Sequence, residues 1–381
     1  MKFKKIFACL LAGAILLAML GCSAVDNAGL QGTRPSENPT LVTENTEPTI
    51  PQPGANSTFS VHFIDVGQAD AALIECDGHY MLIDGGNKAD SNVIYSVLQK
   101  ANVQKLDIVV GTHAHEDHIG GLPGAFSYTT ADVTLCPVKT YDSAAFSDFA
   151  NYATQKGGGI TVPKAGDTYA LGSAVVTILG LNADSDANNT SIVLRVDYGQ
   201  TSFLFCGDAE REAEQALLNA NANLSATVLK VGHHGSDTST TYPFLREIMP
   251  EYAVISVGKG NSYGHPTEDT LSRLRDADVK LYRTDLQGDI YCTSDGETVT
   301  FSVSKNANAD VFGGIGNNST QQPEQNLPAT DPDSGSAEMV WIPKSGTKYH
   351  SHAGCSNMNN PTEVTKEEAE ERGFTACKKC W

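Results

Sequence analysis

The fold is decided by a run of eleven residues that contains three histidines and an aspartate, Gly111-Thr112-His113-Ala114-His115-Glu116-Asp117-His118-Ile119-Gly120-Gly121. It follows Leu106–Val110, a compact apolar segment that is typical of a buried strand. Side chains in a Gly-flanked loop at a strand end can converge on one point. Imidazole and carboxylate groups suit zinc, and also iron or manganese. The run therefore predicts a metal site, in which His113 and His115 face one ion and Asp117 and His118 reach a second.

Apolar patterns on both sides of this run predict alternating strands and helices. Upstream we expect an antiparallel meander of strands at Phe59–Val66, Ala71–Glu75 and Tyr80–Ile83, and then a helix at Ala89–Ala101. Downstream we expect strands at Ala174–Leu179, Ser191–Val196, Thr201–Cys206, Ala226–Val231, Ala253–Val257 and Val279–Thr284, and helices at Glu210–Asn219, Tyr242–Met249 and Thr267–Asp276. Two rounds of meander and helix predict an α/β fold with two sheets face to face and helices outside, a four-layer αββα sandwich. Because this order fits several α/β folds, the assignment depends on the motifs.

The motifs occur in the order found in one known family. The histidine run resembles the His-x-His-x-Asp-His signature of the metallo-β-lactamase superfamily. Five further motifs are similar to those of the extracytoplasmic hydrolase domain of the ComEC/Rec2-like competence proteins and its stand-alone relatives: Asp65-Val66-Gly67-Gln68, Leu82-Ile83-Asp84-Gly85-Gly86, Gly207-Asp208, Gly232-His233-His234-Gly235-Ser236 and Tyr263-Gly264-His265-Pro266. The likeness covers about residues 60–303 and implies a metallo-β-lactamase fold.

The resemblance also assigns metal ligands outside the histidine run. It implies that Asp208 bridges two ions, although an aspartate after Gly207 could by itself be a turn residue. His233 and His234 are neighbours and normally face opposite ways, so we expect His234 to ligate and His233 to support it or to meet the substrate. The expected site holds two divalent ions, zinc or alternatively manganese, on His113, His115, Asp117, His118, Asp208 and His234.

Several other polar residues have two possible roles. Asn189 stands where many superfamily members have another histidine, so one ion is expected to have fewer protein ligands and an open position for water or a phosphate oxygen. Asn189 itself could approach the site. Asp65 and Asp84, at strand ends, either form turns or support the ligand histidines. His265, flanked by turn residues and expected to be exposed, either has a structural role or meets the substrate, by binding its anion or protonating a leaving group. No pattern suggests a role for His62 or His79.

The expected reaction is a hydrolysis in which a hydroxide held between the two metal ions attacks the substrate. The expected catalytic residues are Asp117, His233 and His265. The resemblance implies phosphoester or phosphodiester substrates, such as DNA or phosphate-linked envelope polymers. The alternatives are a hydrolase of lactams, lactones or thioesters, and a non-catalytic accessory protein that binds DNA or the cell wall. No obligate protein partner is inferred.

The chain is strongly acidic, with a formal net charge of −19, or about −22 without Lys2, Lys4 and Lys5 of the N-terminal segment. Nonspecific binding of nucleic acid depends on lysine and arginine contacts to phosphates. The composition therefore excludes a bulk polyanion binder. A nucleic-acid substrate would have to be held locally, by metal.

Residues 1–22 resemble a lipoprotein signal peptide. Three lysines precede an apolar run, Ile6–Leu20, that is too short for a typical membrane-spanning helix. The run ends in Leu20-Gly21-Cys22-Ser23, which resembles a lipobox with Cys22 as the acylated residue. A plain N-terminal membrane anchor is the alternative. In both cases we expect an extracytoplasmic protein, anchored to the cell membrane or secreted, with a disordered tether at 23–58, a hydrolase domain at 59–305 and a linker at 306–336.

Residues 337–381 are expected to form a small zinc-binding module. Cys377 and Cys380 have the spacing of a zinc knuckle, and Cys355 with one histidine would complete four ligands. About 45 residues with little apolar content hardly fold without such a staple. The segment resembles zinc modules related to the N-terminal metal site of the Ada repair protein, and this likeness favours His350 over His352. A disulfide is the alternative. The remaining cysteines of the hydrolase domain are expected to be mostly buried thiols: Cys76, Cys136, Cys206 and Cys292.

Overall fold

The computed structural model of the chain describes residues 50–182, 184, 186–313, 339–342, 348–351, 355, 361–372, 374–377 and 380. The predicted signal peptide, most of the predicted tether and residues 314–336 of the predicted linker lie outside these residues. Within the described ranges, no helix has both the length and the apolar character needed to cross a membrane.

The first sheet has eight strands in the order β15-β14-β1-β2-β3-β4-β5-β6. Their bounds are β1 (Phe59–Phe63), β2 (Ala72–Cys76), β3 (His79–Ile83), β4 (Leu106–Val110), β5 (Ala131–Leu135), β6 (Ile160–Thr161), β14 (Ile290–Ser294) and β15 (Val299–Val303). Strands β1, β2 and β3 pair antiparallel, and β4 joins β3 in parallel. The predicted opening meander is therefore confirmed.

The second sheet has seven strands in the order β13-β12-β11-β10-β9-β8-β7. Their bounds are β7 (Thr168–Leu171), β8 (Ala174–Gly180), β9 (Val193–Tyr198), β10 (Thr201–Phe205), β11 (Val228–Lys230), β12 (Tyr252–Ile255) and β13 (Lys280–Arg283). Strands β7 to β10 form an antiparallel meander, and β11 to β13 continue in parallel from β10. The two sheets thus repeat one plan, a meander followed by parallel strands.

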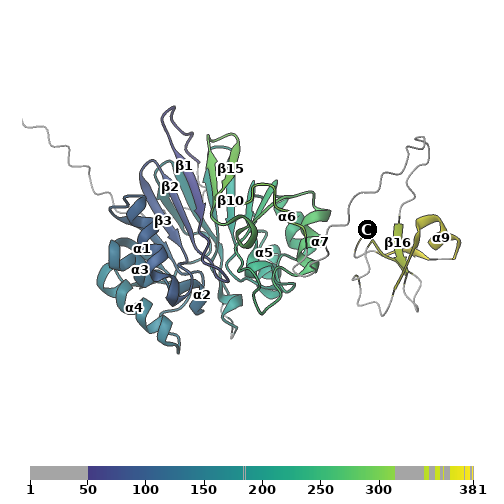
Figure 1. Cartoon of the computed structure of the whole chain (residues 1–381), viewed down its shortest axis with the longest axis horizontal. Coiled ribbons are helices and arrows are strands. Elements are labelled where there is room, and N and C mark those ends of the chain that lie inside the picture. The colour runs from purple at the N-terminus through teal and green to yellow at the C-terminus, as the bar shows by residue number, and fades with distance from the viewer. Residues whose placement is uncertain are drawn as a thin grey trace, which may run out of the picture. The chain divides into compact units, whose positions relative to one another are not determined.

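The two sheets face each other across a shared apolar core, and helices cover their outer faces (Figure 1). Across the core, the rings of Phe63 and Phe205 lie 6.1 Å apart, and those of Phe59 and Phe203 lie 4.8 Å apart. Each fully buried side chain of this size contributes roughly 1.5–3 kcal/mol. Helices α1 (Ser91–Lys100), α3 (Leu122–Tyr128) and α4 (Ala144–Lys156) cover the first sheet, and α5 (Arg211–Asn219), α6 (Tyr242–Ile248) and α7 (Glu268–Asp276) cover the second. The predicted four-layer αββα sandwich is confirmed.

Short helices complete the connections between strands. They are α2 (Glu116–Ile119), α8 (Thr284–Gln287) and the 3-10 turns η1 (Lys88–Asp90), η2 (Asn188–Thr190) and η3 (Gly232–Gly235). The loop after β4 meets the second sheet at two points: the amide of Ile192, just before β9, donates to the carbonyl of Thr112 at 2.8 Å, and Gly207, just after β10, packs against Thr112. Gly207 permits this approach: its φ is +52°, and a Cβ there would lie 2.9 Å from both the Ser191 hydroxyl and Thr112 Cβ. The close contact places the ends of both strands at one point.

The C-terminal part of the chain has small elements of its own. Strand β16 (Met339–Ile342) pairs antiparallel with β18 (Thr362–Thr365), and β17 (Lys348–Tyr349) pairs in parallel with β19 (Thr375–Ala376). Helix α9 (Lys366–Glu371) follows β18. Among the described residues of this part, the buried apolar side chains that pack together are Val340, Ile342, Tyr349, Val364 and Ala369, with Phe374 and Ala376 partly buried against them.

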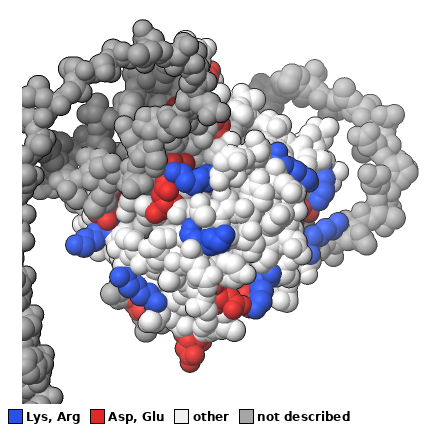
Figure 2. All heavy atoms as spheres, turned by 90° about the vertical axis from the view of Figure 1, so that its left-hand side faces the viewer, with Lys and Arg blue, Asp and Glu red and all other residues white. Residues whose placement is uncertain are grey.

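The face of the first sheet's helices carries scattered charges (Figure 2). Lysine and arginine residues alternate there with acidic residues and are separated by uncharged surface, so the coloured part of this face presents no continuous basic area. This distribution agrees with the acidic composition. It gives a long polyanion no broad surface to bind on this side.

Candidate metal centre

The predicted ligands come from loops at the ends of strands in both sheets. His113 and His115 follow β4, and Asp117 and His118 lie in the first turn of α2. Asp208 follows β10, and His234 lies in η3 after β11. The sandwich brings these loops together, because β4 belongs to the first sheet and β10 and β11 to the second.

Four of the predicted ligands form a tight cluster, Asp117, His118, Asp208 and His234, whose donor atoms lie within 4.8 Å of one another. Nε2 of His118 is 3.2 Å from Asp208 Oδ1, and Nε2 of His234 is 3.3 Å from Asp117 Oδ2. His118 Nε2, Asp208 Oδ1 and His234 Nε2 are buried and have no hydrogen-bond partner in the described part of the chain. Buried polar atoms usually have partners. The two imidazoles and two carboxylates of this cluster therefore place unpartnered polar atoms close to one another. Such an arrangement fits a divalent cation.

His113 and His115 form a second group on the other side of Asp208. Nε2 of His113 is 3.1 Å from Nδ1 of His115 and 4.0 Å from Asp208 Oδ2. Asp208 therefore faces His118 with one oxygen and His113 with the other. This is the position expected of a carboxylate shared by two ions. Ion binding itself remains a prediction.

Charges in the cluster balance one another when no cation is bound. Burial raises the pKa of Asp208, but the imidazoles of His118, His234 and His113 outweigh burial and hold it well below its usual range. Burial lowers the pKa of His234, but Asp208 and Asp70 outweigh it and raise this pKa to about 10. The pKa of His118 is raised by Asp208 and Asp84 against burial in the same way. The carboxylates and the imidazoles of His118 and His234 thus shift one another's pKa values against the effect of burial.

Asp84 fixes the orientation of His118. Its Oδ2 lies 2.8 Å from His118 Nδ1, and it also accepts hydrogen bonds from the amide and hydroxyl of Thr112 at 2.8 and 2.7 Å. With Nδ1 engaged, Nε2 of His118 is the nitrogen that faces Asp208. Asp65 has a different role. Its side chain pairs with Lys305 and accepts a hydrogen bond from the amide of Gly67, and among the described residues it contacts none of the predicted ligands. Of the two alternatives for these aspartates, Asp84 supports a ligand and Asp65 forms a turn.

Asp70 and Lys230 support His234, and the sequence analysis missed both. Lys230 Nζ donates to Asp70 Oδ2 at 2.8 Å, and both side chains are buried. Asp70 Oδ1 lies 3.4 Å from His234 Nδ1, which is also 3.1 Å from the carbonyl of Ser256. The Asp70 amide donates to the Asp117 carbonyl. A lysine inside an apolar strand is the signal that could have revealed this pair, because buried lysines need a partner.

His233 points to the edge of the cluster. Its Nδ1 lies 3.2 Å from Glu210 Oε1 and 3.2 Å from the Thr238 hydroxyl, and its Nε2 lies 3.8 Å from Asp208 Oδ2. The side chain of His233 is 20% exposed, whereas that of His234 is 3% exposed. Both residues have left-handed backbone angles. The neighbours thus differ as expected, with His234 inside the cluster and His233 at the surface.

Two expectations about individual side chains are wrong. His265 is 8% exposed and not a surface residue, because Asn261 folds the loop inward: its Nδ2 donates to the His265 carbonyl at 2.6 Å and its Oδ1 accepts from the His265 amide. Burial, with the neighbouring His233 and His234, lowers the pKa of His265 to about 4. Asn189 does not turn its oxygen to the cluster. Its Oδ1 accepts from the amides of Glu210 and Ala213 and so caps helix α5.

The remaining histidines and cysteines of the hydrolase domain lie outside the cluster. His62 pairs with Asp289 and His79 with Asp107, each at 2.9 Å. The four cysteines predicted as buried thiols, Cys76, Cys136, Cys206 and Cys292, are buried and free, as expected. None of these residues contacts a predicted ligand in the part of the structure that is described.

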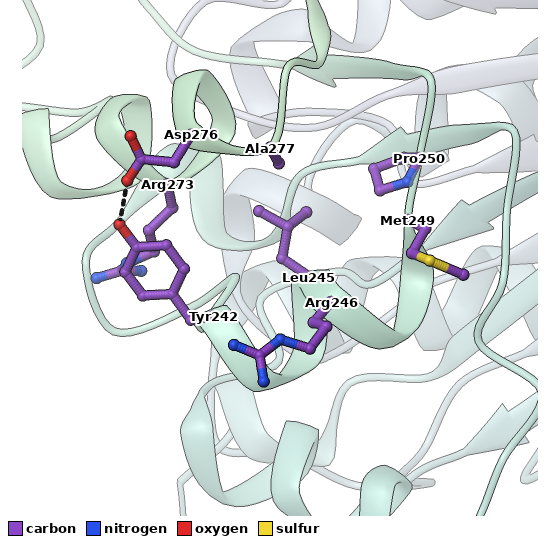
Figure 3. Close-up of a pocket in the computed structure, with 8 residues that line it drawn as sticks. All are labelled: Tyr242, Leu245, Arg246, Met249, Pro250, Arg273, Asp276 and Ala277. Carbon is purple, nitrogen blue, oxygen red and sulfur yellow. Dashed lines mark hydrogen bonds between the residues drawn. The ribbon is translucent and has the colours of Figure 1, made fainter. Parts of the chain in front are cut away.

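A cavity of about 380 Å³ between α6 and α7 is separate from the metal centre (Figure 3). Its lining is Tyr242, Leu245, Arg246, Met249, Pro250, Arg273, Asp276 and Ala277. The Tyr242 hydroxyl donates to Asp276 at 2.6 Å, and the Arg273 guanidinium donates to the Ser239 carbonyl at 2.7 Å. The lining of this cavity contains no histidine and no cysteine.

The C-terminal part contains its own cluster of His350, Cys355, Cys377 and Cys380, with donor atoms within 4.8 Å. The sulfurs of Cys355 and Cys377 are 3.9 Å apart, and the sulfur of Cys380 is 3.7 Å from His350 Nδ1. None of the three cysteines forms a disulfide within the part of the chain that is described. The alternative ligand, His352, lies outside the described residues. The structure thus brings together the four residues that the sequence analysis selected.

Comparisons with known proteins agree with this geometry. Residues 64–259 match the model of the metallo-beta-lactamase superfamily. ComE operon protein 3 of Bacillus subtilis is 30% identical over 271 residues, which are 66% of this chain and 35% of that protein. Competence protein ComA of Neisseria gonorrhoeae is 33% identical over 226 residues, 59% of this chain and 30% of that protein. The chain thus spans about a third of these relatives. The metallo-beta-lactamase fold protein YhfI from Bacillus subtilis is 12% identical with a TM-score of 0.39, covering 64% of this chain and 100% of that one.

We predict that Asp70→Asn weakens metal binding by about 10- to 100-fold, because the amide neither balances Lys230 nor orients His234. Competition with a chelating dye measures the affinity, and the absorption spectrum of the cobalt-substituted protein reports on the ligands. Asp107→Asn is the matched control, since Asp107 is also buried beside a histidine, His79, but lies outside the cluster. Equal affinities of Asp70→Asn and the unaltered protein would contradict the role of Asp70.

We predict one zinc ion on the C-terminal cluster, because three thiols and one imidazole at this spacing form a closed tetrahedral site. Mass spectrometry after alkylation of the unreduced chain should find free thiols at Cys355, Cys377 and Cys380. Cys380→Ser should remove one zinc ion per chain and leave the metal of the main domain in place. An intact disulfide among these cysteines would defeat the prediction.

Proposed function

Because the chain belongs to the metallo-β-lactamase superfamily, we propose that it is a metal-dependent hydrolase of phosphoesters or phosphodiesters, such as DNA or phosphate-linked envelope polymers. The observation that carries the proposal is the position of Asp208, whose Oδ1 faces His118 and whose Oδ2 faces His234 and His113, with His115 beside His113. Two divalent ions, zinc or manganese, would be held there. When bound, they would supply a nucleophile at neutral pH and neutralise charge on the phosphoryl group.

The residues around the two ions would have separate roles in the reaction. Asp117 and Asp208 supply the negative charge that retains cations, and Asp84 and Asp70 keep His118 and His234 in fixed orientations. Glu210 engages Nδ1 of His233, so Nε2 faces the Asp208 side of the site at a partly exposed position. His233 is therefore suited to contact the leaving oxygen of the substrate. His265 packs against it with ring centroids 5.6 Å apart, and its buried Nδ1 has no partner among the described residues.

Phosphodiester substrates are supported by chemistry and by the relatives. The absence of a third histidine before Asp208 leaves the His113 side with fewer protein ligands, because Asn189 is used to cap α5. A phosphate oxygen can fill such a position. The relatives are named competence proteins, and DNA is a phosphodiester polymer. The net charge of −19 requires that a strand be held locally, at the metal centre.

We also propose that the protein acts outside the cytoplasmic membrane, held by an acylated Cys22, and needs no protein partner. The basic and apolar segments before Cys22 support this location. Cell fractionation of Cys22→Ala tests it, and the variant should leave the membrane fraction. An unchanged membrane distribution would argue for a plain N-terminal anchor.

We predict that Asp117→Ala lowers hydrolysis of bis(p-nitrophenyl) phosphate by at least about 100-fold, because it removes both a ligand and its negative charge. The fold should persist, since the Asp117 side chain is 32% exposed in a loop-end helix. Glu116→Ala is the matched control, an exposed acidic neighbour outside the cluster. In the same assay His265→Ala should keep the metal content and lower turnover. Turnover of nitrocefin or a lactone without any phosphodiesterase activity would refute the proposed substrate class.

A further inference from the structure

A row of aromatic rings crosses the candidate metal centre and ends in an exposed tyrosine on each side. Tyr141 is 39% exposed and Tyr263 is 71% exposed. Neighbouring ring centroids along the row are separated by these distances: Tyr141–His115 6.2 Å, His115–His113 4.7 Å, His113–His118 4.1 Å, His118–His234 5.3 Å, His234–His233 6.2 Å, His233–His265 5.6 Å and His265–Tyr263 5.7 Å. The two tyrosines thus bracket the cluster.

The ring of Tyr263 already has the geometry of a stacking platform. It lies nearly parallel to the His265 ring, with an interplanar angle of 25°, while most of its surface meets solvent. One face of Tyr263 therefore rests on a buried histidine and the other is free. Tyr141 lies at 72° to the His115 ring and at 55° to the Phe146 ring, each with centroids 6.2 Å away, and 39% of it is exposed. Exposed single tyrosines are common, but two placed at the ends of a candidate catalytic row are a specific arrangement.

Each tyrosine is accompanied in the chain by an exposed lysine. Lys139 precedes Tyr141 by two residues, and Lys259 precedes Tyr263 by four. Neither lysine forms an ion pair with any residue that the structure describes, whereas Lys88, Lys105 and Lys305 do. Aromatic rings together with basic side chains are the combination by which proteins bind single-stranded nucleic acid: bases stack on the rings and phosphates approach the cations.

We propose that Tyr141 and Tyr263 stack on the bases that flank the scissile phosphodiester, so that the preferred substrate is a single-stranded nucleic acid. The inference rests on the proposed hydrolase function. Envelope polymers built from polyol phosphates have no planar face for these rings. Bases in a duplex are stacked on each other and are not free to stack on protein. Binding through two rings and two lysines also suits a protein whose overall charge of −19 repels long polyanions.

Kinetics on two strands of equal length test the proposal with the full, metal-loaded chain. One is an oligothymidylate, and the other is an abasic strand with the same sugar-phosphate backbone. We expect kcat/KM to favour the oligothymidylate by about 10-fold or more, mainly through KM. Methyl p-nitrophenyl phosphate, which carries no base, reports separately whether the protein is a phosphodiesterase. Activity on this diester with no preference between the strands overturns the base-stacking inference and leaves the proposed function intact.

Variants of the two tyrosines test whether these residues cause the preference for the oligothymidylate over the abasic strand. Tyr141→Ala and Tyr263→Ala should each reduce the ratio between the two strands by about 10-fold, and the corresponding Phe variants should retain it because the ring remains. Tyr95→Ala is the control: Tyr95 is 36% exposed and also has an aromatic neighbour, Tyr128 at 5.2 Å, but it lies in α1. A ratio unchanged in both Ala variants overturns the proposal.

A binding measurement decides the matter even without hydrolysis. Fluorescence anisotropy of a labelled oligothymidylate gives the affinity for the unaltered chain and for Tyr263→Ala. If no phosphodiester is cleaved, the proposed function fails, and binding that weakens about 10-fold in Tyr263→Ala still supports a base-stacking site. Equal affinity of the two proteins, or binding of the abasic strand as tightly as the oligothymidylate, counts against it.

Discussion

The structure depends on the burial of one carboxylate, Asp208, among imidazoles that come from both sheets. A buried carboxylate is costly unless positive charge lies close by. Here His118 and His113 come from the segment after β4 in the first sheet, and His234 follows β11 in the second sheet, to which Asp208, after β10, also belongs. The two sheets must therefore pack with these strand ends in register. One hydrogen bond joins the two sheets at this point, since the Ile192 amide, just before β9, donates to the carbonyl of Thr112, just after β4, at 2.8 Å. Within the second sheet, the Asp208 amide donates to the Ser191 hydroxyl and the His233 amide to the Gly207 carbonyl, each at 3.0 Å.

Two charged side chains hold the backbone of the segment that follows His234. The segment after His234 is held on one side by Glu214, whose carboxylate accepts hydrogen bonds from the amides of Thr240 and Thr241. On the other side, the guanidinium of Arg273 donates to the carbonyls of Ser239 and Asp237. Both charged side chains come from helices that cover the second sheet. Helices α5 and α7 thus fix the backbone of the segment after His234, which favours precise placement of the metal ligands.

Much of the fold and of the site could be predicted from local sequence patterns. The features that depend on long-range contacts could not. The strands around the histidine run and helices α1, α5, α6 and α7 follow from apolar periodicity, because each pattern lies within one element. Asp70 and Lys230 were missed because their partnership spans 160 residues. The burial of His265 depends on two bonds to Asn261 within an apparently ordinary turn. Between β4 and β7, the short strands β5 and β6 and the helices α3 and α4 escaped prediction, although Ser143, which caps α4 by accepting from the Phe146 amide, was a usable signal.

The two candidate metal clusters of this chain differ in the number of protein donors for an ion, which distinguishes catalytic from structural metal sites. In the C-terminal cluster, three thiols and His350 supply four donors, and His350, Cys355 and Cys377 are buried. An ion bound by four protein donors has no position for a substrate. In the main cluster, the second histidine group has only three predicted donors, His113, His115 and the shared Asp208, and His233 at its edge is partly exposed. Water and substrate can reach a site of this kind. The chemistry of the chain is therefore expected at Asp208, and the thiol cluster is expected to hold the C-terminal segment together.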